Sequence, residues 1–101
     1  MIYELAFVDD ALKEWRKLDG TIRKQFKSKL EERLANPAVP SARLCGSDNR
    51  YKIKLRSAGY RLVYEVRNQE ILVVVVAVGK RERNEVYKTA ARRSVEDGSR
   101  S

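Results

Sequence analysis

Lysine and arginine alternate with apolar residues in the middle of the chain, and a second basic cluster with a tyrosine follows nearer its end. The two clusters consist of Lys52, Lys54, Arg56 and Arg61, and of Lys80, Arg81, Arg83 and Tyr87. Arginine binds phosphate oxygens through paired hydrogen bonds, and lysine supplies a compact positive charge. These residue types indicate a site for a phosphate-rich ligand, for which RNA is the natural match.

The second cluster also has the residue types needed for RNA cleavage. Attack by the 2′-hydroxyl requires a base for that hydroxyl, cations for the pentacoordinate phosphate and an acid for the departing 5′-oxygen. The chain has no histidine, so tyrosine, lysine, arginine and the carboxylates are the remaining candidates. Nearby positive charge favours the phenolate form of a tyrosine. Tyr87 is the best-placed tyrosine, because it follows Lys80, Arg81 and Arg83 closely.

Each of these features also fits a purely structural interpretation. An alternating charged strand is more often a solvated sheet face than an active site, and a tyrosine such as Tyr87, taken alone, is more often a plain surface or interface residue. The other aromatic side chains fall on apolar faces, where they fit the core: Trp15, Phe26, Tyr51, Tyr60 and Tyr64. Residue types alone therefore leave both interpretations open.

Composition limits the class of protein. A chain of 101 residues is long enough for one domain with one core. Its 22 basic and 14 acidic residues give a net charge of +8, which predicts a polyanionic partner such as nucleic acid, an acidic protein or an anionic membrane surface. The single cysteine, Cys45, excludes an internal disulfide, and the N-terminus lacks the pattern of a signal peptide. We expect a cytoplasmic protein with no metal site and no cofactor.

The first half of the chain predicts a strand followed by a helical hairpin. Residues 2–8 fit a strand, and Asp9 and Asp10 are placed to cap a helix whose apolar face includes Trp15 and Leu18. The pair Asp19-Gly20 interrupts that helix. A second helix follows and ends near residue 36, before a proline; its apolar positions are spaced by four and are Ile22, Phe26, Leu30 and Leu34.

The second half predicts a sheet. After a loop over residues 37–49, three segments at 51–56, 60–67 and 71–78 fit strands joined by tight turns, which form an antiparallel meander. The segment 71–78 is apolar on both faces and is expected to be central. A basic helix over about 84–95 follows. The fold class is therefore α+β, with a single domain over residues 1–95 and a flexible polar tail at 96–101.

The spacing around Gly59 predicts the faces of the first hairpin. A two-residue loop at 58–59 makes Ser57 oppose Tyr60, Arg56 oppose Arg61, Lys54 oppose Val63 and Lys52 oppose Glu65. The four cations of the first cluster then share one face, and Glu65 forms a weak ion pair with Lys52. The opposite face, available to the helices, carries Tyr51, Ile53, Leu55, Leu62 and Tyr64. An odd loop length would bury charge, so an even length is predicted.

Three stretches resemble the RelE toxins of bacterial toxin–antitoxin systems. They are the residues at 11–18, the sequence Tyr51-Lys52-Ile53-Lys54-Leu55-Arg56-Ser57 with Gly59-Tyr60-Arg61-Leu62-Val63-Tyr64, and Val78-Gly79-Lys80-Arg81-Glu82-Arg83 with Glu85-Val86-Tyr87. The resemblance covers about residues 2–95, and the loop at 37–50 and the tail depart from it. It implies a microbial-ribonuclease-like fold: a helical hairpin on an antiparallel sheet, with a C-terminal helix.

The resemblance also implies an activity. RelE toxins enter the ribosomal A site and cut the mRNA there through the 2′-hydroxyl, which inhibits translation and leaves a 2′,3′-cyclic phosphate. Carried over to this chain, Tyr87 is the general base and Arg81 the acid or leaving-group stabiliser. The phosphate clamp is Lys52, Lys54 and Arg61, with Lys54 a second candidate for the base. Further contacts to 16S rRNA are expected from Arg56, Lys80 and Arg83.

The implied partners are the 70S ribosome with mRNA in its A site, a RelB-like antitoxin, and operator DNA through the antitoxin complex; no membrane is implied. An acidic, partly disordered antitoxin fits the charge of +8. Two alternatives stay open. One is a ParE-type toxin that shares the fold but binds DNA gyrase, and the other is a non-catalytic nucleic-acid-binding regulator. Intact clamp and tyrosine positions favour the nuclease over both.

Overall fold

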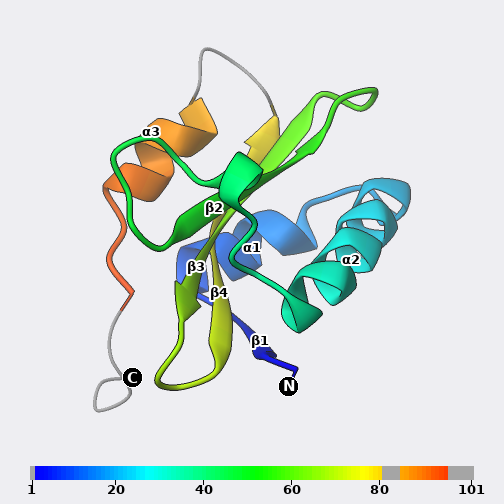
Figure 1. Ribbon diagram of the computed structural model, residues 1–101. Coiled ribbons are helices and arrows are strands. Elements are labelled where there is room, and N and C mark those ends of the chain that lie inside the picture. The colour runs from blue at the N-terminus through cyan, green and yellow to red at the C-terminus, as the bar shows by residue number, and fades with distance from the viewer. Residues whose placement is uncertain (1, 81–84, 96–101) are drawn as a thin grey trace.

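The computed structural model describes residues 2–80 and 85–95, which form the predicted α+β fold (Figure 1). The elements in chain order are β1 (Glu4–Phe7), α1 (Asp9–Arg16), α2 (Gly20–Ala35), a 3₁₀ turn (Pro40–Ala42), β2 (Arg50–Leu55), β3 (Tyr60–Arg67), β4 (Leu72–Lys80) and α3 (Glu85–Ala91). The sheet order is β1-β4-β3-β2. The predicted antiparallel meander of β2, β3 and β4 is confirmed, and β4 is an interior strand. The N-terminal strand β1 pairs in parallel with β4, so the sheet is mixed.

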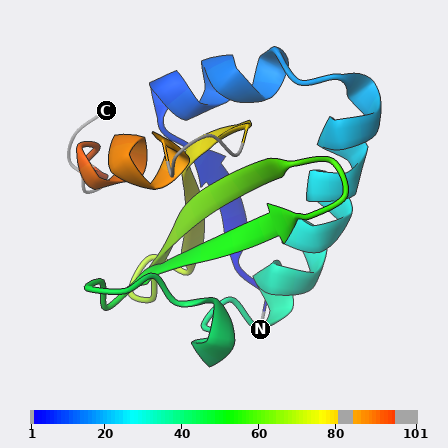
Figure 2. The ribbon, with the colours of Figure 1, turned by 90° about the horizontal axis from the view of Figure 1, so that it is seen from above.

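Both faces of the sheet are covered, as Figure 2 shows for α2 and α3 on its opposite sides. On one face, Phe26 and Leu30 of α2 are buried in the main core. The strand residues predicted for this face are all buried in the same core: Tyr51, Ile53, Leu55, Leu62 and Tyr64. On the other face, Val86 and Ala90 of α3 form a second, smaller cluster with β3 and β4. Successive strand residues point to opposite faces, so the alternation explains both layers.

The helix boundaries follow local sequence signals, with one correction. Asp9 and Asp10 do not cap α1, because Val8 occupies the capping position and both aspartates lie in the first turn. There their charges stabilise the positive end of the helix dipole. Asp19 is a true cap, since its carboxylate accepts a hydrogen bond from the Thr21 amide at 3.0 Å. The second helix ends at Ala35, immediately before the predicted boundary near residue 36.

The predicted register of the first hairpin is wrong by two residues. The strands end at the pair Leu55 and Tyr60, so the loop has four residues, 56–59, and Lys54 opposes Arg61. The loop is closed by the Gly59 amide, which donates to Leu55 O at 2.8 Å, and Gly59 has a φ of +71°. A four-residue loop is still even, so every strand side chain keeps its predicted face. Arg56, however, lies in the turn and not in a strand.

Two further expectations change in the second half. Lys52 opposes Val63, and Glu65 pairs instead with Arg50, so the ion pair predicted between Lys52 and Glu65 does not form. The last helix is shorter than predicted, because the chain from 93 to 95 has no regular structure. Residue 84 and the tail at 96–101 lie outside the described residues. Within the described ranges, no helix is long and apolar enough to cross a membrane.

Candidate functional site

The cations of the first cluster meet on the sheet face that faces away from α2. Lys54 and Arg61 are directly opposed across β2 and β3, and Lys52 lies two residues along the same face of β2. All three are half-buried, whereas their neighbours Ile53 and Leu62 point into the core on the other face. Like charges directly opposed destabilise a sheet. The arrangement therefore favours an anion bound between them.

Tyr87 is brought to these cations by α3. The Arg61 guanidinium donates a hydrogen bond from Nη1 to the Tyr87 hydroxyl at 3.0 Å and lies 5.4 Å from the centre of its ring. The neighbours of Tyr87 in α3 contribute to this position, since Val86 and Ala90 are buried against β3 and β4. A cation that donates to a hydroxyl oxygen stabilises negative charge on that oxygen. Of the three residues expected to form the phosphate clamp, Arg61 is therefore in direct contact with Tyr87.

Lys54 lines two polar depressions, which the other cations of the first cluster also line. One of about 270 Å³ is lined by Lys54, Leu55, Arg56, Gly59, Tyr60 and Arg61. The other, of about 280 Å³, is lined by Arg33, Ser41, Ala42, Lys52, Lys54 and Arg56. Arg56 is thus part of the cationic surface although it lies in the turn. In the part of the chain that the structure describes, neither depression is lined by a carboxylate, so both suit anionic ligands.

Arg33 is a site residue that the sequence did not reveal. Its Nη1 donates to the Tyr64 hydroxyl at 2.8 Å and to Lys52 O at 3.3 Å, which holds the guanidinium beside the clamp. The Tyr64 hydroxyl in turn donates to Pro37 O at 2.7 Å. In the sequence, Arg33 is one of many basic residues on the polar face of α2. Only the packing of that helix on β2 distinguishes it.

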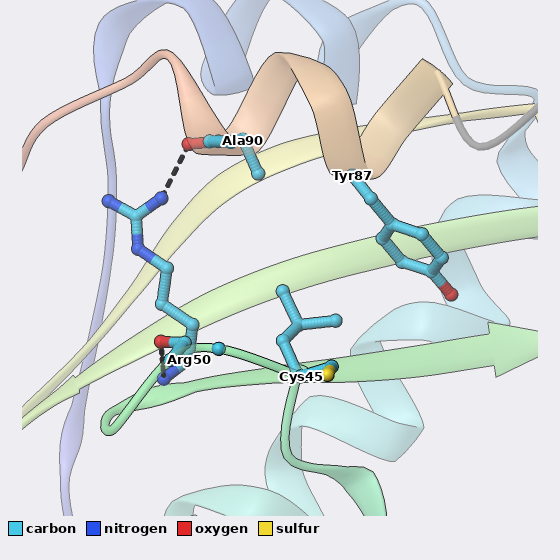
Figure 3. Close-up of a pocket in the computed structure, with 8 residues that line it drawn as sticks. Cys45, Arg50, Tyr87 and Ala90 are labelled. Carbon is cyan, nitrogen blue, oxygen red and sulfur yellow. Dashed lines mark hydrogen bonds between the residues drawn. The ribbon is translucent and has the colours of Figure 1, made fainter.

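A larger pocket of about 470 Å³ separates α3 from the loop before β2 (Figure 3). Its lining residues are Leu44, Cys45, Gly46, Ser47, Arg50, Tyr87, Ala90 and Ala91. Arg50 and Tyr87 stand on opposite sides of it, and the exposed thiol of Cys45 lies between them. Arg50 is the second site residue that the sequence analysis missed. With the four-residue hairpin loop, its cross-strand pairing to Glu65 follows from the sequence.

The second basic cluster is only partly described. Lys80 is exposed at the end of β4, where it opposes Tyr60. Arg81 and Arg83 lie outside the described residues, so their predicted places beside the clamp are expectations. In residues 2–80 and 85–95, no group of three or more histidine, cysteine, aspartate or glutamate side chains is arranged to hold a metal ion. The side chains that do converge are cations and a phenol, which suit a phosphate ligand.

Known proteins share both this sequence and this fold. The family model described as the ParE toxin of the type II toxin–antitoxin system parDE matches residues 5–85 of this chain. The chain is 54% identical to the mRNA interferase toxin RelE of Escherichia coli K12 over 93 residues, which are 92% of this chain and 98% of that protein.

Solved structures agree. A free-state arginine double mutant of E. coli RelE matches with a TM-score of 0.86 and 50% identity, covering 94% of this chain and 100% of the other. The intact E. coli RelBE toxin–antitoxin complex matches with a TM-score of 0.77 and 53% identity, covering 80% of this chain and 99% of the matched chain. The chain therefore belongs to the ParE toxin family of type II toxin–antitoxin systems, as a RelE-like member.

Proposed function

We propose that this chain is a ribosome-dependent endoribonuclease that cuts mRNA in the A site of the 70S ribosome and so inhibits translation. The observation that carries the proposal is the contact of Arg61 with the Tyr87 hydroxyl on a face that also holds Lys52 and Lys54. The relatives named mRNA interferase support the same reaction class. A non-catalytic binding surface needs cations, but it does not need a phenol aligned with them.

The proposed reaction is a transesterification within the RNA. Tyr87 takes the proton of the 2′-hydroxyl as the general base; Lys54 is the alternative base. The 2′-oxygen forms a bond to the adjacent phosphorus, and Lys52, Lys54 and Arg61 stabilise the negative charge on the pentacoordinate phosphate. The bond from phosphorus to the 5′-oxygen then breaks, which leaves a 2′,3′-cyclic phosphate and a 5′-hydroxyl.

Arg81 is proposed to stabilise the departing 5′-oxygen. A guanidinium has too high a pKa to be an efficient proton donor, so its role is to hold negative charge while a solvent proton arrives. The cations supply the electrostatic stabilisation that a metal ion supplies in other nucleases, so we propose a metal-independent reaction. No cofactor takes part in these steps.

The ribosome is proposed to supply the orientation of the RNA. The cations that line the two depressions can bind any phosphate, so free RNA is proposed to bind there in many orientations. Holding the codon in the A site restricts it to a reactive one, which contributes a large part of the rate. Arg56, Lys80 and Arg83 are proposed to contact 16S rRNA through its phosphates.

The regulatory partner is proposed to be a RelB-like antitoxin in the cytoplasm. The E. coli relative is solved as an intact RelBE complex, and a surplus of +8 charges attracts an acidic partner. The pair is proposed to act as a corepressor on its own operator DNA, with the DNA contacts made through the antitoxin complex.

A second candidate is a ParE-type toxin that binds DNA gyrase, because the matching family model is the one for ParE toxin. Gyrase binding does not need the contact between Arg61 and Tyr87, so this contact favours the nuclease. It likewise opposes a purely regulatory nucleic-acid binder.

Primer extension on an mRNA held in a purified 70S complex tests the proposal. The same RNA free in solution is the control. We expect a new stop within the A-site codon only with ribosomes and protein together. Folded, antitoxin-free protein that leaves both RNAs intact would refute the nuclease and turn attention to gyrase.

A further inference from the structure

Arg50 joins the second strand to the end of the last helix. Its Nε donates to a Glu65 carboxylate oxygen at 2.9 Å, and its Nη2 donates to Arg93 O at 2.6 Å. Its Nη1 donates to Ala90 O, the bond drawn in Figure 3. One guanidinium therefore serves three acceptors on two separate segments, a geometry that its planar donor array allows.

Glu65 and Arg67 extend this contact. The second carboxylate oxygen of Glu65, whose side chain is 9% exposed, accepts a hydrogen bond from Arg67 Nη1 at 3.2 Å. The same Arg67 nitrogen donates to Val95 O at 3.2 Å. We call Arg50, Glu65 and Arg67 the arginine latch. Its two guanidinium groups bind backbone carbonyls at 90, 93 and 95, and its carboxylate holds them both in place.

The latch acts on the segment that carries Tyr87. The helix α3 has seven residues, and isolated helices of that length are unstable in water. Only Val86 and Ala90 of α3 are buried, and both are small. Arg50 also places a positive charge at the C-terminal end of the helix, where the helix dipole favours it. Apolar burial alone is therefore a weak constraint on where the Tyr87 hydroxyl lies.

We propose that Arg50, held by Glu65, is a positioning residue that fixes α3, together with the ion pair of Arg93 and Glu14, and thereby places the Tyr87 hydroxyl against Arg61 for RNA cleavage. Arg50 acts through the helix backbone, at the far side of the pocket from Tyr87 (Figure 3). The catalytic part of this inference rests on the proposed function. The mechanical part, that the latch holds residues 85–95, does not.

The test compares Arg50→Met with Arg92→Met. Methionine keeps an unbranched apolar stem in place of that of the arginine but removes the guanidinium and all of its donors. Arg92 is exposed, follows the same helix and is not part of the latch, so its replacement removes the same charge from the same region. Glu65→Gln is the milder second variant, because it keeps the side-chain size and one acceptor oxygen while removing the charge.

Two measurements are made on each full-length protein. The first is hydrogen exchange of backbone amides in the free protein, with β3 and β4 as the internal reference for global folding. The second is the single-turnover rate of mRNA cleavage in 70S complexes as a function of protein concentration, which separates the maximal rate from the half-saturating concentration.

For Arg50→Met we expect at least about tenfold faster exchange across 85–95 with β3 and β4 unchanged. The maximal cleavage rate should fall by about ten- to a hundredfold at an unchanged half-saturating concentration, as expected for a misplaced catalytic group. Glu65→Gln should change both quantities in the same direction by less, and decides the matter if Arg50→Met does not fold. Arg92→Met should match the wild type in both measurements.

If the amides of residues 85–95 exchange in Arg50→Met at the same rate as in the wild type, the proposal that the latch holds this segment is refuted. Faster exchange with an unchanged maximal rate would overturn the positioning role, as would a loss confined to the half-saturating concentration. If the wild type itself cleaves nothing, the proposed function fails, while the exchange experiment still decides whether the latch holds the segment of Tyr87.

Discussion

Replacing Arg61 and Tyr87 singly and together measures whether the two act as one unit. Arg61→Met removes the donor to the hydroxyl and the clamp charge, and Tyr87→Phe removes only the hydroxyl. Either change alone breaks the hydrogen bond of 3.0 Å between them. The double variant loses that bond only once, so its loss of cleavage should be smaller than the sum of the two single losses.

The geometry also predicts by how much the loss in the double variant falls below the sum of the two single losses. A hydrogen bond to a charged group in a partly buried setting contributes about 1.5–3 kcal/mol. At about 1.4 kcal/mol per tenfold change in rate, this coupling corresponds to about ten- to a hundredfold. We therefore expect the double variant to cleave about ten- to a hundredfold faster than multiplying the two single effects predicts. Tyr87→Phe should also keep ribosome binding, because it leaves every cation in place.

Single-turnover cleavage of A-site mRNA in 70S complexes is the assay, with ribosome binding and denaturant midpoints measured on the same proteins. If the cleavage rate of the double variant agrees within about twofold with the product of the two single effects, the view that Arg61 acts on the Tyr87 oxygen is refuted. Loss of ribosome binding in Tyr87→Phe would instead make Tyr87 a docking residue.

Three other outcomes are expected. Arg81→Ala should lower cleavage by orders of magnitude at an unchanged denaturant midpoint, and wild-type activity would exclude Arg81 from the reaction. Leu30→Ala should lower the free energy of unfolding by about 2–5 kcal/mol, because Leu30 is 1% exposed in the core; an unchanged urea midpoint would contradict the packing of α2 on the sheet. Burial raises the pKa of Tyr64 above its ordinary 10.0, although the hydrogen bond and charge of Arg33 partly oppose this. The stability gained by keeping Tyr64 neutral is thus fully present below pH 10 and is lost as pH rises through the raised pKa. The decline in urea midpoint above pH 10 should be shallower in Tyr64→Phe than in the wild type, and parallel curves would rule this contribution out.

The layers of this fold could be predicted from periodicity because periodicity reports which face is buried. Spacing by four placed Phe26 and Leu30 in the core, and alternation placed Ile53 and Leu62 opposite the cations. The hairpin register could not be predicted in the same way. Loops of two and four residues give the same faces, so the hydrophobic pattern does not distinguish them, and the closing bond to Gly59 depends on backbone geometry.

The parts of the site that escaped prediction depend on contacts between distant segments. Arg33 reaches the cationic depression because α2 packs against β2. No residue near Arg33 in the sequence indicates that this packing occurs. Arg50 binds the carbonyls of Ala90 and Arg93, which any residue type would present equally. By contrast, the cations of β2 and β3 and Tyr87 could be named as candidates because their own residue types are unusual together, and the structure places Tyr87 against one of them, Arg61.

The parallel pairing of the first strand has a consequence for how the protein is made. Glu4 lies beside Leu72, so the residues of β1 are synthesised long before the strand with which they pair. Lys54 and Arg61 pair within a local hairpin, whereas Tyr87 joins them from a helix that begins after β4, so the site needs contacts between segments that are far apart in the sequence. The candidate site is therefore incomplete until α3, the last described element of the chain, has been synthesised.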